Sequence, residues 1–157
     1  TLNVEALDIT LFGDLAPQEG ANFVSLSQEG FYDGIDCHRL VTDGIFVLQC
    51  GDPNGDGTGG PGYTWGPIEN APEGDLYPAG SIAMARAGNL GDSMGSQFFI
   101  VYEDSVIPSD VAGGYTIMGQ VDNGLETVRQ IATLGTLDGS NDGTPAETVS
   151  IDSVELN

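Results

Sequence analysis

Short runs of alternating apolar and polar residues recur along this chain and indicate β-strands. Residues 6–12, ALDITLF, alternate as a half-buried strand does. Two apolar runs, residues 36–41 and 45–50, are separated by TDG, which is typical of a β-hairpin. We expect the later strands at residues 81–85, 97–103, 115–121 and 148–156.

Two other segments carry their apolar residues at helical spacing. One follows Pro17 and breaks near Gly30, and the other covers residues 123–134 and ends at Gly135. The strands do not alternate one for one with helices, which argues against a doubly wound parallel sheet. The pattern instead predicts a mainly β chain, with an antiparallel closed sheet and two capping α-helices. Because neither a repeat nor a second boundary is visible, residues 1–157 are expected to form a single domain.

The charge balance is strongly acidic. The chain has 24 acidic and 3 basic side chains, no lysine, and a formal net charge of -21. Such a surface repels phosphates and anionic headgroups, so we expect neither nucleic-acid binding nor binding to a membrane surface. No apolar run approaches the roughly 20 residues that span a bilayer, so this segment is not expected to insert into a membrane.

The same acidity indicates a protein adapted to a saline or extracellular setting. The chain begins at Thr1 without a methionine or a signal-like segment, which leaves earlier removal of a signal or anchor open. We therefore expect an extracytoplasmic or secreted location in preference to a cytoplasmic one.

The stretch GDPNGDGTGGPGY, residues 51–63, begins like a calcium-binding loop. Asp52, Asn54 and Asp56 have the required spacing, but position twelve is Tyr63 where that loop needs a glutamate. Neither flank reads as a helix. A glycine-rich turn segment is favoured, with a weak non-helical calcium site as the minor alternative. The segment SNDGT, residues 140–144, is interpreted as a simple turn.

The two cysteines, Cys37 and Cys50, are too few for a disulfide framework and lack the spacing of a zinc site. One bridge between neighbouring strands and two small buried thiols are both left open.

Two of the three arginines lie in predicted strands or at a strand end, Arg39 in the first case and Arg86 in the second, whereas Arg129 lies on a predicted helix among acids. A strand arginine in so acidic a chain is solvated, paired with a carboxylate or directed at a ligand. Phe98 and Phe99 are neighbours on a strand and must point to opposite faces. One of them therefore meets the interior, and the other meets a helix, a pocket or solvent.

These residues also carry a resemblance. The segments CHRLV, FVLQCGD, GTGGPGY, SIAMARAG, GSQFFI and YTIMGQV, in this order, resemble the cyclophilin family of peptidyl-prolyl isomerases over nearly the whole chain. Residues 12–34 resemble the first helix of that family with its flanks. The resemblance implies an eight-stranded antiparallel barrel capped by two helices, with a proline site on its outer face.

The resemblance also implies roles for particular residues. Arg39 and Gln49 match the catalytic positions, with Arg39 stabilising the twisted amide. The positions that match substrate-binding residues are Phe46, Val47, Ala85, Arg86, Gln97, Phe99, Ile107 and Tyr115. The implied partners are proline-containing peptides and unfolded or flexible protein segments, and neither a metal nor a cofactor is needed. A fold that binds proline segments without turnover, and an acidic calcium-binding surface domain, are the alternatives.

The chain departs from the family pattern at several positions. Tyr115 stands where the family often has histidine, and we expect activity to survive because tyrosine also donates a hydrogen bond and supplies an aromatic wall. Val106 stands where a tryptophan often helps to bind cyclosporin, which predicts weak cyclosporin binding. Two extra residues separate Arg39 from Gln49, and the amino-terminal strand pair is short.

Strand parity bears on the cysteines. Cys37 and Arg39 point to the same face of their strand, because they are two residues apart. Cys50 and Gln49 are neighbours and point to opposite faces of theirs. If Arg39 and Gln49 both face the site, a regular hairpin places the two thiols on opposite faces and opposes a disulfide. A β-bulge would reverse this expectation.

Overall fold

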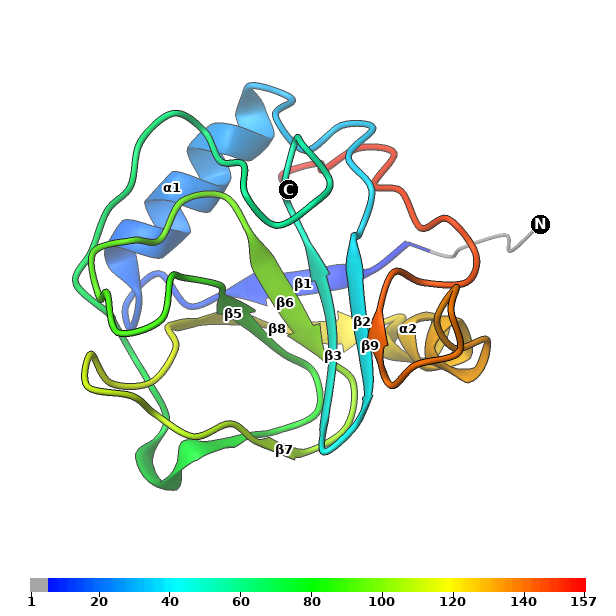
Figure 1. Ribbon diagram of the computed structural model, residues 1–157. Coiled ribbons are helices and arrows are strands. Elements are labelled where there is room, and N and C mark those ends of the chain that lie inside the picture. Colours follow the sequence, from blue (N-terminus) through cyan, green and yellow to red (C-terminus); the bar gives the residue numbers. More distant parts are fainter. Residues whose placement is uncertain (1–5) are drawn as a thin grey trace.

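The computed structural model describes residues 6–157, and its centre is one curved antiparallel sheet (Figure 1). The seven strands lie in the order β1-β8-β5-β6-β3-β2-β9. In chain order they are β1 (Asp8–Leu11), β2 (Arg39–Asp43), β3 (Ile45–Cys50), β5 (Ser81–Met84), β6 (Phe98–Val101), β8 (Ile117–Asn123) and β9 (Asp142–Gly143). A separate two-stranded ladder of β4 (Leu76–Tyr77) and β7 (Ser105–Val106) follows a 3-10 turn at Glu73–Asp75.

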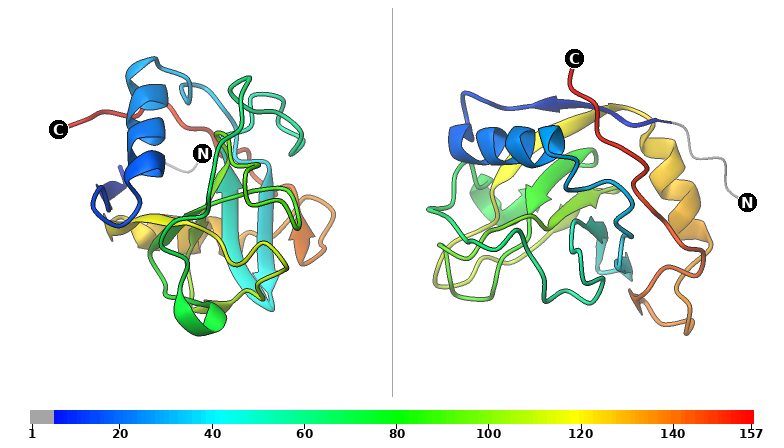
Figure 2. Two further views of the ribbon diagram at one scale, coloured as in Figure 1. Left: turned by 90° about the vertical axis from the view of Figure 1, so that its left-hand side faces the viewer. Right: turned by 90° about the horizontal axis from the view of Figure 1, so that it is seen from above.

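Two α-helices lie on opposite sides of the molecule (Figure 2). Helix α1 (Pro17–Gln28) begins with a proline, whose missing N–H is not needed in the first turn. Helix α2 (Leu125–Thr133) follows Gly124, which has a φ of 95° that favours glycine. Among residues 6–157, no helix combines the length and the apolar character that crossing a membrane requires.

The sheet has an apolar cluster on each face because its side chains alternate. On one face, Phe98 and Ile100 of β6 pack in a large core with residues of both helices. On the other face, Phe99 and Val101 join a smaller cluster with Val47 and Ile107. The two neighbouring phenylalanines thus point to opposite faces, as expected.

The expected mainly β fold with two helices is confirmed, but the sheet is not a closed eight-stranded barrel. Within the described residues, β1 and β9 are its two edges. Residues 148–156 were expected to form the last strand, but they form no ladder. Residues 149–151 make isolated backbone bonds to residues 34–37, for example from the Cys37 N–H to the Val149 carbonyl at 2.7 Å. After β9 the chain bonds instead to residues 135–137, where the Leu137 N–H donates to the Thr144 carbonyl at 2.8 Å and the Ala146 N–H donates to the Gly135 carbonyl at 2.9 Å.

The hairpin predicted from residues 36–41 and 45–50 forms, but its first strand is shifted to Arg39–Asp43. Arg39 pairs with Gln49 and Asp43 with Ile45. Gly44 at the tip has a φ of 82°, a conformation that other residues adopt at a cost. TDG therefore closes the hairpin without disturbing its register.

Cys37 and Cys50 form a disulfide, so the parity argument against it is wrong. The N–H of His38 donates to the carbonyl of Gln49, which is already the partner of Arg39. Two residues of one strand therefore face one residue of the other, which is the signature of a β-bulge. The bulge moves Cys37 to the face of Cys50, and their Cα atoms are 4.0 Å apart.

Candidate active site

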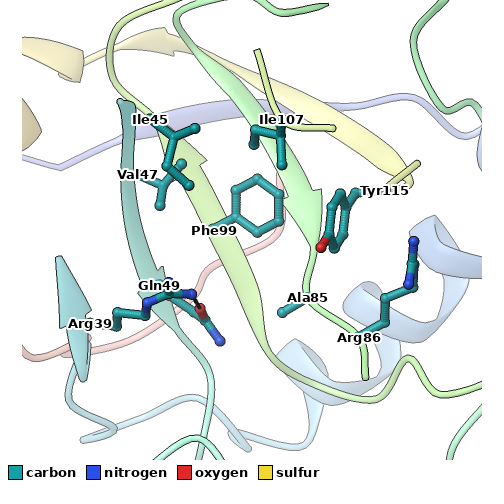
Figure 3. A pocket seen from close by; sticks show the side chains of 9 residues that line it. All are labelled: Arg39, Ile45, Val47, Gln49, Ala85, Arg86, Phe99, Ile107 and Tyr115. Atoms are coloured by element: carbon teal, nitrogen blue, oxygen red, sulfur yellow. Dashed lines mark hydrogen bonds between the residues drawn. The ribbon is translucent and has the colours of Figure 1, made fainter. Parts of the chain in front are cut away.

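A pocket of ≈ 140 Å³ opens over the smaller apolar cluster, and we call it the apolar pocket. Figure 3 shows its side chains converging from several strands and loops. Its lining consists of Arg39, Ile45, Val47, Gln49, Ala85, Arg86, Phe99, Ile107 and Tyr115. The structure thus brings together residues that lie up to 76 positions apart in sequence, from Arg39 to Tyr115.

Strand β3 supplies one wall through alternation. Ile45, Val47 and Gln49 point into the apolar pocket, and Phe99 of β6 lies beside them because it pairs with Gln49. Phe46, predicted to bind substrate, points to the opposite face and packs edge-on against Tyr102, with ring centroids 6.0 Å apart. Phe46 therefore lies outside the pocket, and Ile45 occupies the position that was expected of it.

A chain of hydrogen bonds runs along one rim of the pocket, from a guanidinium through two side-chain amides. Arg39 Nη1 donates to Gln49 Oε1 at 3.4 Å, and Gln49 Nε2 donates to Gln97 Oε1 at 2.8 Å. Gln97 Nε2 in turn donates to the carbonyls of Gly57 and Gly59 at 3.0 and 2.9 Å. The predicted residues Arg39, Gln49 and Gln97 thus form one connected set that ends on the glycine-rich loop.

Arg39 has a second partner on β9. Its Nε and Nη2 donate to the two carboxylate oxygens of Asp142 at 2.9 and 2.8 Å. The hydrogen bond from Arg39 holds the pKa of Asp142 below its ordinary value, and the same bond raises the pKa of Arg39. The guanidinium is therefore fully charged at every physiological pH.

Aromatic rings form the opposite wall. Phe99 and Tyr115 meet edge-on with centroids 5.6 Å apart, and Tyr77 contacts both rings from below. The Tyr115 N–H donates to Tyr77 Oη at 2.8 Å, which ties the backbone of this wall to the buried Tyr77. The wall is thus held by ring packing and by a hydrogen bond from the Tyr115 main chain to the Tyr77 hydroxyl.

Arg86 holds the loop that carries Tyr115. Its side chain has 0% exposure and pairs with Asp110 at 3.0 Å. It also donates to the carbonyls of Gly113 and Gly114, and its guanidinium carbon lies 4.6 Å from the centre of the Tyr115 ring. The hydrogen bonds from Arg86 hold the pKa of Asp110 far below its ordinary value.

A second hollow of ≈ 250 Å³ adjoins the first and shares Gln49, Ala85 and Arg86 with it. Its far side is the glycine-rich loop of residues 51–63. The buried Asp52 accepts the N–H groups of Asn54, Asp56 and Gly57 there. Asp52 therefore holds the loop in shape from its buried side. In residues 6–157, no group of three or more His, Cys, Asp or Glu side chains is arranged to bind a metal ion.

Four residues of this region were missed at the sequence level: Ile45, Tyr77, Asp110 and Asp142. Ile45 could have been found, because it shares strand parity with Val47 and Gln49. The other three reach the site from turns and short strands whose pairing has no local pattern in the sequence.

The arrangement suits one kind of chemistry. An apolar, aromatic pocket accepts a compact ring, and a fixed cation with two amides on its rim faces whatever polar group adjoins that ring. Among the nine residues that line the apolar pocket, none is a nucleophile with a neighbouring base to activate it. The arrangement can therefore hold a compact ring with a polar group beside it.

Comparisons with known proteins agree with this geometry. The family described as "Cyclophilin type peptidyl-prolyl cis-trans isomerase/CLD" matches residues 1–156. The probable peptidyl-prolyl cis-trans isomerase B of Mycobacterium tuberculosis is 43% identical over 162 residues, covering 96% of this chain and 51% of that protein. The chain thus spans about half the length of this relative.

Two further comparisons cover both partners more evenly. Peptidyl-prolyl cis-trans isomerase B of Bacillus subtilis is 42% identical over 128 residues, covering 80% of this chain and 82% of that protein. A cyclophilin-type isomerase of Cryptosporidium parvum, solved in the presence of the dipeptide Ala-Pro, superimposes with a TM-score of 0.77 at 29% identity. The superposition covers 96% of this chain and 93% of the Cryptosporidium parvum chain.

Proposed function

The chain belongs to the cyclophilin-type peptidyl-prolyl cis-trans isomerase family, and on this premise we propose that it accelerates rotation about X–Pro peptide bonds. Enzymes of this class need no cofactor, because no bond is made or broken. The proposed substrates are proline-containing peptides and unfolded or flexible protein segments, and the proposed role is assistance in protein folding.

The reaction fixes what the site must do. Rotation of the amide has a barrier of about 18–20 kcal/mol because twisting removes resonance. The twisted amide has a pyramidal nitrogen with a lone pair, and an enzyme must bind this form better than either planar form. A guanidinium close to that nitrogen would stabilise it, and we assign this role to Arg39, which lines the rim of the apolar pocket.

The other residues position the substrate. Ile45, Val47, Phe99 and Ile107 surround the space for the proline ring, and Tyr115 closes its far side. Gln49 orients Arg39 and contacts the substrate carbonyl. The backbone of Arg86, where the chain leaves β5 and Ala85 bonds to Gln97, anchors the extended peptide.

One observation supports this function above the others: a hydrogen-bonded arginine at the edge of an apolar pocket of proline size. The test is cis/trans exchange of a short Ala-Pro peptide followed by NMR, with the parent protein, Arg39→Ala and Arg129→Ala. Arg129→Ala is the matched control, because it removes the same charge from α2, where Arg129 pairs with Glu103 and Glu126. We expect the parent and Arg129→Ala to accelerate exchange and Arg39→Ala to lose most of it.

Other outcomes separate the alternatives. Acceleration that persists in Arg39→Ala keeps the isomerase and refutes this role of Arg39. Binding of the peptide without acceleration by the parent favours a module that holds proline segments without turnover.

Two narrower proposals follow from single features. Val106 is 59% exposed on β7 beside Ile107, and a valine there offers little to hold cyclosporin, so binding of that ligand is proposed to be weak. The Cys37–Cys50 disulfide favours an oxidising, extracytoplasmic environment.

A further inference from the structure

The carboxylate of Asp142 forms an ion pair with Arg39 and does not itself line the apolar pocket. Nε and Nη2 of Arg39 donate to the two separate oxygens of Asp142, at 2.9 and 2.8 Å. Such a two-point contact fixes the plane of a guanidinium as well as its position. The edge that carries Nη1 is then turned toward Gln49 and the pocket.

The backbone around Asp142 is itself ordered for this contact. β9 pairs with β2, with Val41 opposite Asp142. The Ser140 N–H donates to Asp138 Oδ1 at 3.0 Å, and the Ser140 hydroxyl, with its single proton, lies within hydrogen-bond distance of Asp138 Oδ1 and of the Asp142 carbonyl oxygen, at 2.6 and 3.0 Å. The turn of residues 140–144 is therefore held at both ends and presents its aspartate to the arginine of the adjacent strand.

The ion pair is better suited to orientation than to stability. The side chains of Arg39 and Asp142 are 44% and 51% exposed, and exposed ion pairs contribute little to folding. A long arginine side chain at such an exposed rim samples many rotamers unless a partner restricts it. Gln49 alone, at 3.4 Å from Nη1, is a long contact for that task.

We propose that Asp142 is a positioning residue for the isomerase reaction, which holds the Nη1 edge of Arg39 toward the prolyl nitrogen without touching the substrate. The inference rests on the proposed function. A carboxylate next to a guanidinium also weakens the field of the cation. Orientation outweighs this loss, because a lone pair that exists only in the twisted amide needs a donor fixed in direction.

The test compares kcat and KM for an Ala-Pro peptide in the parent, Asp142→Asn, Asp142→Glu and Asp43→Asn. Asp43→Asn removes the same charge from the far end of β2, where the side chain is exposed. We expect Asp142→Asn to lower kcat roughly tenfold with little change in KM, and Asp142→Glu to recover part of the loss. Asp43→Asn should behave as the parent.

A double-mutant cycle tests whether Asp142 acts through Arg39. In an Arg39→Ala background, Asp142→Asn should cause no further loss of kcat. A loss of the same size in both backgrounds shows that Asp142 acts through the fold, and it overturns the proposal. An Asp142→Asn variant as fast as the parent, or faster, overturns it as well.

A spectroscopic measurement is independent of turnover. The chain has three arginines, so its Nε–Hε region in NMR contains three signals to assign. Hydrogen exchange at Arg39 Hε should be slow in the parent and fast in Asp142→Asn, with Arg86 and Arg129 unchanged. Equal exchange at Arg39 in both proteins refutes the pairing. A parent without isomerase activity refutes the proposed function, whereas an active parent matched by Asp142→Asn refutes only the role of Asp142.

Discussion

Neighbouring side chains on β3 perform different tasks. Ile45 and Val47 line the apolar pocket, whereas Phe46 and Leu48 pack in the core that the helices cover. The division follows from the two-residue period of a strand. Binding and stability should therefore separate between adjacent positions.

Alanine substitutions at Ile45 and Phe46 test that separation. Ile45→Ala should raise KM for an Ala-Pro peptide several-fold, because it widens the pocket, and should lower the free energy of unfolding by about 1 kcal/mol, because it removes fewer half-buried carbons than Phe46→Ala does. Phe46→Ala should leave KM near the parent value and lower the free energy of unfolding by about 2 kcal/mol, since the ring is half-buried. Urea unfolding and peptide kinetics on both variants provide the data, and the reverse pattern would restore Phe46 to the site.

Glu19 on α1 is a buried acid away from the site. It has 0% exposure, and among the described residues neither carboxylate oxygen has a hydrogen-bond partner. Burial raises its pKa to about 9, with help from the nearby carboxylate of Glu69. Burial raises the pKa of Tyr32 and of Tyr63, and a charge on Glu19 raises both further. Glu19 is therefore protonated in the folded protein at neutral pH.

This proton makes stability depend on pH. The folded-state pKa lies above the ordinary value of 4.5, so the stabilisation is complete below that value and is lost as pH rises toward about 9. Burial lowers the pKa of His38, so above about pH 7 that side chain is neutral in both states. Between about pH 7 and the folded-state pKa of about 9, the free energy of unfolding should fall by about 1.4 kcal/mol per pH unit.

Glu19→Gln should abolish this slope, because the amide has no proton to lose. Glu29→Gln, on an exposed residue at the end of α1, is the matched control and should retain it. Urea unfolding at a series of pH values measures both. A slope that persists in Glu19→Gln assigns the effect to another group.

The hairpin of β2 and β3 is the element that organises the site. It carries Arg39 and Gln49 as direct partners, and the bulge at His38 lies next to them. The Cys37–Cys50 disulfide closes the open end of this hairpin across a sequence separation of 13. It therefore constrains the unfolded chain where the site residues are joined.

Replacing both cysteines with serine should lower the free energy of unfolding by about 2–4 kcal/mol. A thiol reductant should destabilise the parent by a similar amount and leave the double variant unchanged. Denaturant curves with and without reductant measure the four states. Two titratable thiols in the unreduced parent would contradict the bridge.

The charge of the whole molecule is unbalanced. Each arginine pairs with an acid: Arg39 with Asp142, Arg86 with Asp110, and Arg129 with Glu103 and Glu126. Three arginines face 24 acidic residues in the sequence, so most of the acids have no arginine to pair with. Their mutual repulsion opposes the compact state.

Salt should stabilise the folded protein by screening this repulsion. Raising NaCl from 0.01 to 0.15 M shortens the Debye length from about 30 to 8 Å, and Tm should rise over this range. An uncharged osmolyte at equal osmolality is the control and should have a smaller effect. A Tm that falls with salt would mean that the attractive pairs outweigh the repulsion.

The sequence by itself determined the local structure and most of the chemistry. Period-two and helical patterns predicted β3, β5, β6, β8 and both helices, because alternation and turn residues act over a few neighbours. The family-like motifs predicted Arg39, Gln49, Phe99, Ile107 and Tyr115 as site residues, and all five line one pocket. The charge and the absence of lysine were likewise legible in the sequence.

Only the tertiary structure decided how distant segments meet. The bulge at His38 reversed the face of Cys37, the sheet ended at β9 without closing, and the turn at 140–144 brought Asp142 to Arg39. Each of these depends on pairing between segments far apart in the chain. A one-residue change in register alters such contacts completely while leaving the local pattern unchanged.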